Sequence, residues 1–168
     1  DSARAAVKAA RAQARAAGVK IAMTFSDPAM VRFFKPGLAE MLDDGVDLLF
    51  CNEEEACLWS DALSVEAALE ALKKVAGQIV ITRGSKGALV WDGSQRIDIA
   101  PTPVTPLDSN GAGDMFAGAY LFGLTRGWTP ARAGGLASRA AAAVVGRFGP
   151  RLALEDHGAL LRDYNNSI

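Results

Sequence analysis

Short apolar runs alternate along this chain with segments of helical periodicity. The runs at 19–25, 46–51 and 78–82 are rich in Val, Ile, Leu and Phe, and amphipathic stretches separate them. Parallel strands need crossover connections, which are usually helices, so this order is typical of α/β folds. The pattern predicts a three-layer α/β/α fold with a mainly parallel sheet and helices on both faces.

Local signals predict where the individual elements begin and end. We expect a helix over 2–17 and a buried strand over 19–25. Asp27 and Pro28 predict the start of a second helix, which Gly45 ends and whose spacing places Val31, Phe34, Leu38 and Leu42 on one face. Further helices are expected at 64–76, 112–126, 130–146 and 156–163, and a hairpin at 87–91 and 96–99 across Asp92-Gly93.

Composition excludes several classes of protein. The 168 residues suit one domain, half are hydrophobic and 22% are charged, which excludes general disorder. A net charge of −1 gives no electrostatic reason to bind nucleic acid or a membrane surface, and no apolar run reaches the roughly 20 residues of a membrane span. Cys51 and Cys57 form no CxxC pair and, with one histidine, cannot make an ordinary structural zinc site. We therefore expect a cytoplasmic protein with reduced thiols.

The segment Asp108–Asp114 (DSNGAGD) leads directly into the expected helix 112–126. Small residues at 111–113 let backbone N–H groups face an anion at a helix start, where the helix dipole favours negative charge. Asp114 would lie beside this anion site, where a carboxylate can take a proton from a hydroxyl that attacks a phosphoryl group. The alternative is a glycine-rich turn with an acidic helix start.

Two rival phosphate motifs fit poorly. No G-x-x-x-x-G-K-[ST] loop occurs. A dinucleotide fingerprint fails because the third glycine is displaced to Gly118 and no acid lies between Asp114 and Glu155. A Rossmann-type oxidoreductase is therefore disfavoured.

The segment Thr82–Gly87 (TRGSKG) follows an expected strand, at the sheet edge where α/β folds bind ligands. Gly84 and Gly87 allow close backbone approach, while Arg83 and Lys86 could meet phosphate charge. A plain hairpin turn with solvated cations is the alternative.

The segment 52–55 (NEEE) also follows an expected strand. Asn52 and Glu55 share one helix face, where they could order a hydrated magnesium ion and a nucleotide phosphate. Alternatively, Asn52 is an N-cap and the glutamates favour the helix dipole.

Together these segments resemble the ribokinase-like, or PfkB, family of carbohydrate and nucleoside kinases. DSNGAGDMFAGA is similar to the family's C-terminal signature DTxGAGD, NEEE to its N-x-x-E motif and TRGSKG to its nucleotide loop. The stretch 138–149 resembles the late helix and loop that flank the adenine. The resemblance covers nearly all of residues 1–168 but only the C-terminal half of family members. It implies the nucleotide-binding portion of a ribokinase-like kinase domain, without the N-terminal half and lid.

The resemblance implies an ATP-dependent transfer of the γ-phosphate to a hydroxyl of a sugar or nucleoside. Asp114 would be the catalytic base. The backbone N–H groups of Gly111, Ala112 and Gly113 would form the anion hole for the transferring phosphate.

The resemblance also implies the cofactors ATP and Mg²⁺. The residues that would contact the nucleotide are Asn52, Thr82, Arg83, Gly84, Ser85, Gly87, Gly113 and Ser138, the last near the adenine or ribose. Glu55 would hold magnesium through water. Asp108 and the loop around Gly149 match the region where some members hold a monovalent cation such as K⁺.

The sequence departs from the family in a few places. Ser109 replaces the usual Thr, and Met115 stands where a small residue is common. The segments TFSDP and VDLLFCNEEEA resemble the adenosine-kinase-like branch. The helical start either covers one face of the sheet or marks the second part of a longer fold.

The family's N-terminal half carries most of its acceptor contacts, so a second hypothesis is a non-catalytic nucleotide-binding fragment that needs that half. We expect that half on the same or a separate chain. An uncovered apolar surface would also favour a homo-oligomer.

Overall fold

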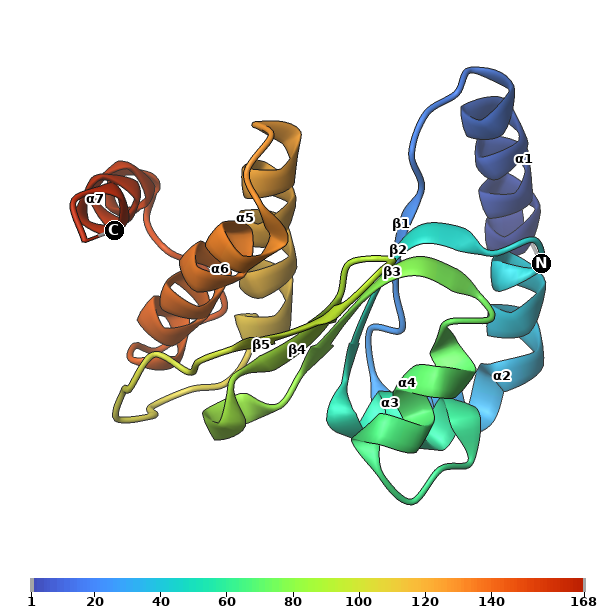
Figure 1. Cartoon of the computed structure of the whole chain (residues 1–168), viewed down its shortest axis with the longest axis horizontal. Coiled ribbons are helices and arrows are strands. Elements are labelled where there is room, and N and C mark those ends of the chain that lie inside the picture. The colour runs from blue at the N-terminus through green and yellow to red at the C-terminus, as the bar shows by residue number, and fades with distance from the viewer. Residues whose placement is uncertain (1, 168) are drawn as a thin grey trace. The chain divides into compact units, whose positions relative to one another are not determined.

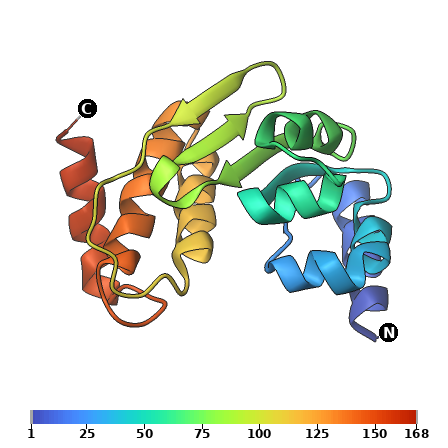
Figure 2. The same cartoon turned by 90° about the horizontal axis from the view of Figure 1, so that it is seen from below.

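The computed structural model describes residues 2–167, which form seven α-helices, one short 3₁₀ helix and a five-stranded sheet (Figures 1 and 2). The strands are β1 (Ala22–Thr24), β2 (Val46–Asn52), β3 (Ala76–Thr82), β4 (Ala88–Trp91) and β5 (Arg96–Ile99). The helices are α1 (Ser2–Ala16), α2 (Pro28–Leu42), α3 (Glu53–Ser60), α4 (Val65–Leu72), α5 (Ala112–Thr125), α6 (Pro130–Val145) and α7 (Leu154–Asn165), with η1 at Gly84–Lys86.

The sheet has the order β1-β2-β3-β4-β5 and is mixed. Strands β1 and β2 are parallel, with Met23 opposite Leu49. Strands β4 and β5 are sheet neighbours joined only by 92–95, so they are antiparallel, because a parallel pair needs a longer crossover. The α/β class predicted from the alternation of segments is confirmed.

The chain divides into two compact units. The first comprises Asp1–Ile81 and Trp91–Gln95, and the second comprises Thr82–Val90 and Arg96–Ile168. Each unit has buried apolar side chains of its own: Leu49 and Ile79 are fully buried in the first, and Leu89 and Tyr120 in the second.

In the first unit, helix α2 begins where the sequence predicts it to begin. The Asp27 side chain accepts a hydrogen bond from the Ala29 N–H at 2.6 Å, and Pro28 occupies the first turn. Phe34, however, is 52% exposed, contrary to the expected apolar face. Its non-helical backbone (φ −126°, ψ 19°) lies just before Pro36, which cannot donate a helical hydrogen bond, and the resulting kink interrupts the periodicity.

The expected buried strand at 19–25 is also wrong in part. Only Ala22–Thr24 is a strand, and its residues are exposed or half-buried. β1 is the first strand of the sheet order, so among the described residues one of its sides has no neighbouring strand. Phe25, just after the strand, is fully buried and stacks on Trp59 at 5.0 Å between ring centroids.

In the second unit, helices α5, α6 and α7 lie side by side in both views of the chain (Figures 1 and 2). Small side chains let α5 and α6 approach closely, and Ala133, Ala137 and Ala140 of α6 are almost completely buried. Tyr164 of α7 donates a hydrogen bond to the Arg132 carbonyl at 2.6 Å. This bond fixes the C-terminal end of α7 to the start of α6.

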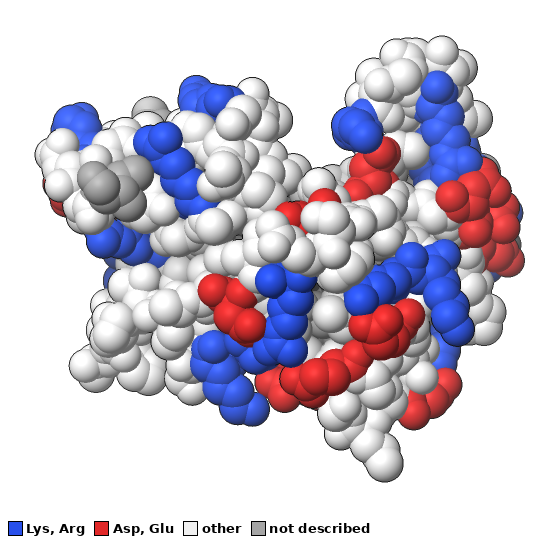
Figure 3. Space-filling model, viewed as in Figure 1, with Lys and Arg blue, Asp and Glu red and all other residues white. Residues whose placement is uncertain are grey.

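Charged side chains of opposite sign lie close together over α1 and α2 in Figure 3. Lys8 pairs with Glu40 at 3.0 Å, and Arg15 pairs with Asp44. Exposed pairs of this kind contribute little stability. None of the helices within 2–167 is long and apolar enough to cross a membrane.

Candidate functional site

The GAGD segment forms the start of helix α5. Gly111 is the N-cap residue and has a left-handed backbone (φ 76°, ψ −1°). A Cβ atom at this position would lie 2.2 Å from the Pro150 carbonyl oxygen, so only glycine fits. The Ala112 N–H donates to the Ser109 carbonyl at 3.3 Å, which closes the turn before the helix. The turn thus requires the residue type that the motif places there.

The first turn of α5 can receive an anion. Gly113 and Asp114 lie within the first helical turn, where backbone N–H groups have no carbonyl partner four residues earlier. Gly113 is exposed, and a Cβ atom there would meet nothing within 4 Å. The open space beside these N–H groups and the positive end of the helix dipole suit a phosphate.

Asp114 is an exposed carboxylate beside that anion position. It lines a cavity of ≈ 670 Å³ in the second unit, together with Gly118 and Phe122 of α5 and Leu160 of α7. Its exposure allows a substrate hydroxyl to reach it, as a general base requires.

Asp108 connects the GAGD loop to the loop after α6. One carboxylate oxygen accepts from the Asn110 N–H at 2.9 Å and the other accepts from the Gly149 N–H at 3.1 Å. These two hydrogen bonds, Asn110 first, hold the pKa of Asp108 below its ordinary value of 3.8. The structure therefore brings together the two segments that the sequence matched to a monovalent-cation region. Within residues 2–167, no group of three or more His, Cys, Asp or Glu could hold a metal ion.

The TRGSKG loop is a tight connection of the second unit. The Arg83 N–H donates to the Gly87 carbonyl at 2.8 Å, and Gly84–Lys86 forms the 3₁₀ turn. A Cβ at Gly87 (φ 82°) would lie 2.0 Å from the Ile99 carbonyl oxygen, so this position also requires glycine.

The Arg83 side chain is engaged within the protein. Its guanidinium lies 3.1 Å from Asp98, and only 16% of the side chain is exposed. By contrast, Gly84 and Ser85 are exposed, and a Cβ at Gly84 would meet nothing within 4 Å. The loop backbone is thus more accessible to a ligand than the arginine that we expected to meet phosphate.

Asn52 and Glu55, in the first unit, form a complete capping box. The Glu55 N–H donates to the Asn52 side chain at 2.8 Å, while the Glu55 carboxylate accepts from the Asn52 N–H at 2.8 Å and from its amide at 2.9 Å. Burial raises the pKa of Glu55, the hydrogen bond from Asn52 opposes this, and the nearby charge of Asp27 adds to it. Glu55 is only 3% exposed. Direct metal coordination would displace its hydrogen bonds, so the arrangement fits contact through water better.

Ser138 is a buried link between α6 and the end of β5. Its hydroxyl donates to the Ala100 carbonyl at 2.9 Å and accepts from the Thr102 N–H at 3.0 Å. The hydroxyl therefore holds the proline-rich segment after β5 against α6.

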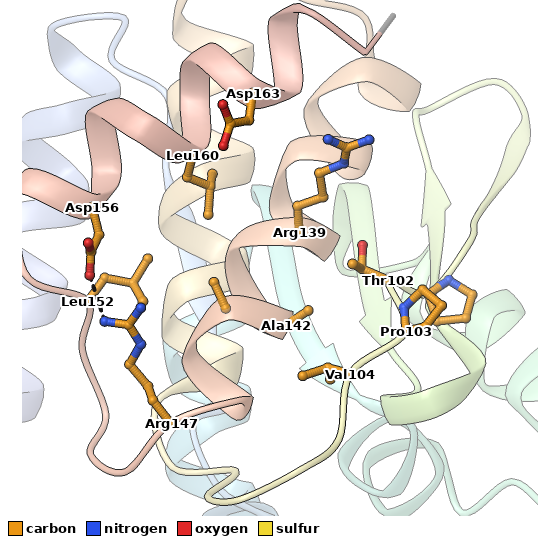
Figure 4. Close-up of a pocket in the computed structure, with 12 residues that line it drawn as sticks. Thr102, Pro103, Val104, Arg139, Ala142, Arg147, Leu152, Asp156, Leu160 and Asp163 are labelled. Carbon is orange, nitrogen blue, oxygen red and sulfur yellow. Dashed lines mark hydrogen bonds and ion pairs between the residues drawn. The ribbon is translucent and has the colours of Figure 1, made fainter.

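A cavity of ≈ 730 Å³ lies next to this link, and Figure 4 shows it. Segment 101–104, helix α6 and helix α7 form its walls. Apolar lining comes from Pro103, Val104, Ala142, Leu152 and Leu160, and charged lining from Arg139, Arg147, Asp156 and Asp163.

Several residues of these sites carry no signal in the sequence that marks their role. Pro150 packs against Gly111, Asp98 pairs with Arg83, and Asp163 lines the cavity. Prolines at 101, 103 and 106 favour an extended segment, but nothing in the sequence indicates that α7 lies opposite it.

Comparison with known proteins identifies the family of this chain and one of its relatives. The pfkB family of carbohydrate kinases matches residues 1–157. The chain belongs to the pfkB family. It is 42% identical over 86 residues to a cytidine kinase of Thermococcus kodakarensis, an alignment that covers 49% of this chain and 31% of the relative.

Solved structures agree with the family assignment. An adenosine kinase from Sinorhizobium meliloti has a TM-score of 0.88 and 29% identity, over 97% of this chain and 49% of its own. An Escherichia coli protein assigned as ribokinase II, solved with ATP and Mg²⁺, has a TM-score of 0.81 and 25% identity, over 94% and 53%. The fold is therefore ribokinase-like, and the chain spans about half the length of these pfkB structures.

Proposed function

We propose that this chain is the nucleotide-binding portion of an ATP-dependent kinase that phosphorylates a hydroxyl of a sugar or nucleoside. The start of α5 carries this proposal, because Gly111 closes a tightly packed turn while the N–H groups of Gly113 and Asp114 have no helical carbonyl partner and lie beside an exposed carboxylate. That combination offers an anion site and a proton acceptor within four residues.

In this proposal the backbone N–H groups of the 111–113 segment hold the phosphate that is transferred. Phosphoryl transfer depends mainly on positioning and on stabilisation of negative charge, which these N–H groups and the helix dipole supply. Asp114 accepts the proton of the attacking hydroxyl. Asp108 shapes the loop through its bonds to Asn110 and Gly149.

We further propose that the cavity of Figure 4 receives the nucleotide base. The cavity adjoins Ser138, and its apolar walls suit the faces of a planar ring. The exposed backbone of Gly84 and Ser85 is the proposed contact for the rest of the nucleotide. Bound Mg²⁺ would neutralise phosphate charge, with Asn52 and Glu55 as the residues that hold it through water.

A single pair of assays tests this function. Calorimetry on the folded chain with MgATP should detect binding, and Asp114→Asn should bind about as well because the backbone N–H groups remain. Labelled ATP should then transfer phosphate to a member of a sugar and nucleoside panel with wild-type chain, and Asp114→Asn should reduce that rate by about a hundredfold or more. Undiminished transfer by Asp114→Asn would exclude Asp114 as the base, and a folded chain that binds no nucleotide would contradict the proposal.

The alternative function is nucleotide binding without catalysis. It is favoured by one observation, namely that the chain spans about half the length of its solved relatives. Tight MgATP binding with no transfer to any acceptor would support this alternative.

A further inference from the structure

The charged residues of the Figure 4 cavity fall into two groups at its two ends. At one end, Arg147 and Asp156 form an ion pair of 2.6 Å between the end of α6 and the start of α7. At the other end, Arg139 of α6 and Asp163 of α7 face the cavity from opposite walls, without an ion pair between them. Arg147 and Asp156 are therefore bound to each other, whereas Arg139 and Asp163 present polar groups to the cavity.

The Asp163 side chain forms no hydrogen bond or ion pair with another residue in the range 2–167, although the next residue of α7, Tyr164, is firmly held. Tyr164 is buried and bonded to the Arg132 carbonyl at 2.6 Å, and the Arg139 guanidinium lies 5.2 Å from the Tyr164 ring centroid. Both polar groups therefore project from anchored positions, so a ligand would meet them at little cost in ordering.

Most of the remaining lining of the cavity is apolar. Pro103 and Val104 form one wall of the cavity, and Ala142 and Leu160 contribute from α6 and α7. A planar heterocycle placed between such walls can form hydrogen bonds only along its edge.

We propose that Asp163 and Arg139 select the base of the phosphate donor by forming hydrogen bonds with the edge of its ring. The inference rests on the proposed function. A carboxylate can only accept hydrogen bonds and a guanidinium can only donate them. Adenine satisfies both groups, because its exocyclic amino group donates to Asp163 and a ring nitrogen accepts from Arg139.

Hypoxanthine carries a carbonyl oxygen in place of the amino group of adenine, and its adjacent ring nitrogen N1 is protonated, so this edge has the opposite hydrogen-bonding pattern. In the pose of adenine, the oxygen would face the acceptor Asp163 and the N1–H group would face the donor Arg139. Sites built to hydrogen-bond a particular group strongly reject an analogue that lacks it. The cavity should therefore prefer adenine nucleotides to inosine nucleotides.

Calorimetry on the folded chain with MgADP and MgIDP tests this selection. The wild type should bind ADP at least about tenfold more tightly than IDP, the scale of one charged hydrogen bond. Asp163→Asn should bring the two affinities within about threefold, chiefly by tightening IDP, because an amide can present either its oxygen or its NH₂ group.

Glu155→Gln is the matched control. It removes the same charge from the same helix, but Glu155 is exposed and lies outside the cavity lining. Its ADP-to-IDP ratio should equal that of the wild type, and a change as large as that of Asp163→Asn would overturn the selection model.

Two further outcomes separate this inference from the proposed function. Equal binding of ADP and IDP by the wild type would overturn base selection by Asp163 while leaving nucleotide binding intact. Failure of a folded sample to bind either nucleotide would contradict nucleotide binding itself, and base selection with it.

Discussion

The substitution Gly111→Ala should destabilise the turn on which the proposed phosphate site depends. The left-handed backbone at φ 76° costs an L-residue about 1–2 kcal/mol. The new Cβ would also lie 2.2 Å from the Pro150 oxygen and 2.8 Å from two backbone carbons of the same residue. These neighbours are main-chain atoms and cannot move as a side-chain tip would, so overpacking adds about 1–3 kcal/mol. The free energy of unfolding should therefore fall by about 2–5 kcal/mol.

Urea unfolding of wild type and variant measures this change directly, and MgATP calorimetry on the folded variant should show weaker binding because the first-turn N–H groups shift. Gly118→Ala is the control, since Gly118 lies within α5 and a Cβ there would meet nothing within 4 Å. That control should gain about 0.5–1 kcal/mol, because alanine favours the helix. Equal unfolding free energies for Gly111→Ala and wild type would refute the steric reasoning.

Three further perturbations test particular side chains. Burial raises the pKa of Glu55 above its ordinary 4.5, so the wild type should lose stability relative to Glu55→Gln as pH rises through the native pKa. A constant difference between the urea midpoints of the two proteins above pH 4.5 would contradict this. Backbone hydrogen bonds, that from Asn110 foremost, lower the pKa of Asp108. The wild type should therefore be more stable than Asp108→Asn at neutral pH, and this difference in stability should disappear as pH falls below 3.8 through the native pKa, as acid unfolding curves will show. Tyr164→Phe removes the hydrogen bond to the Arg132 carbonyl and should cost about 0.5–1.5 kcal/mol, with faster amide hydrogen exchange in α7; an unchanged exchange pattern there would argue against that bond as the anchor of α7.

Features that depend on neighbours a few residues apart were predictable from the sequence. Asp27 and Pro28 start α2 as expected, and the turn at 92–95 forms where Asp92-Gly93 predicts it. There the Asp92 side chain accepts from the N–H groups of Gln95 and Ser94, which lowers its pKa to about 2. The spacing of three residues between Asn52 and Glu55 allowed either a magnesium-ordering pair or a helix cap. The structure contains the cap, as a capping box.

Features that depend on distant segments were not predictable in the same way. The apolar run at 19–25 was expected to be a buried strand, but β1 is short and lies at one end of the sheet order. Phe34 fitted the helical period, yet the kink before Pro36 leaves it exposed. The signal for the kink was in the sequence, whereas its effect on burial was set by how the two parts of α2 pack.

The sequence by itself determined the α/β class, the starts of several helices and turns, and the segments proposed to hold phosphate, because backbone propensities, caps and glycine turns act over three or four residues. Only the tertiary structure decided that the Pro150 carbonyl requires glycine at 111, that Asp98 engages Arg83, and that α7 places Asp163 opposite Arg139. These pairings join residues that lie 15 or more positions apart in the printed sequence. No local preference specifies such contacts, since they arise when whole helices and strands bury their apolar faces against one another.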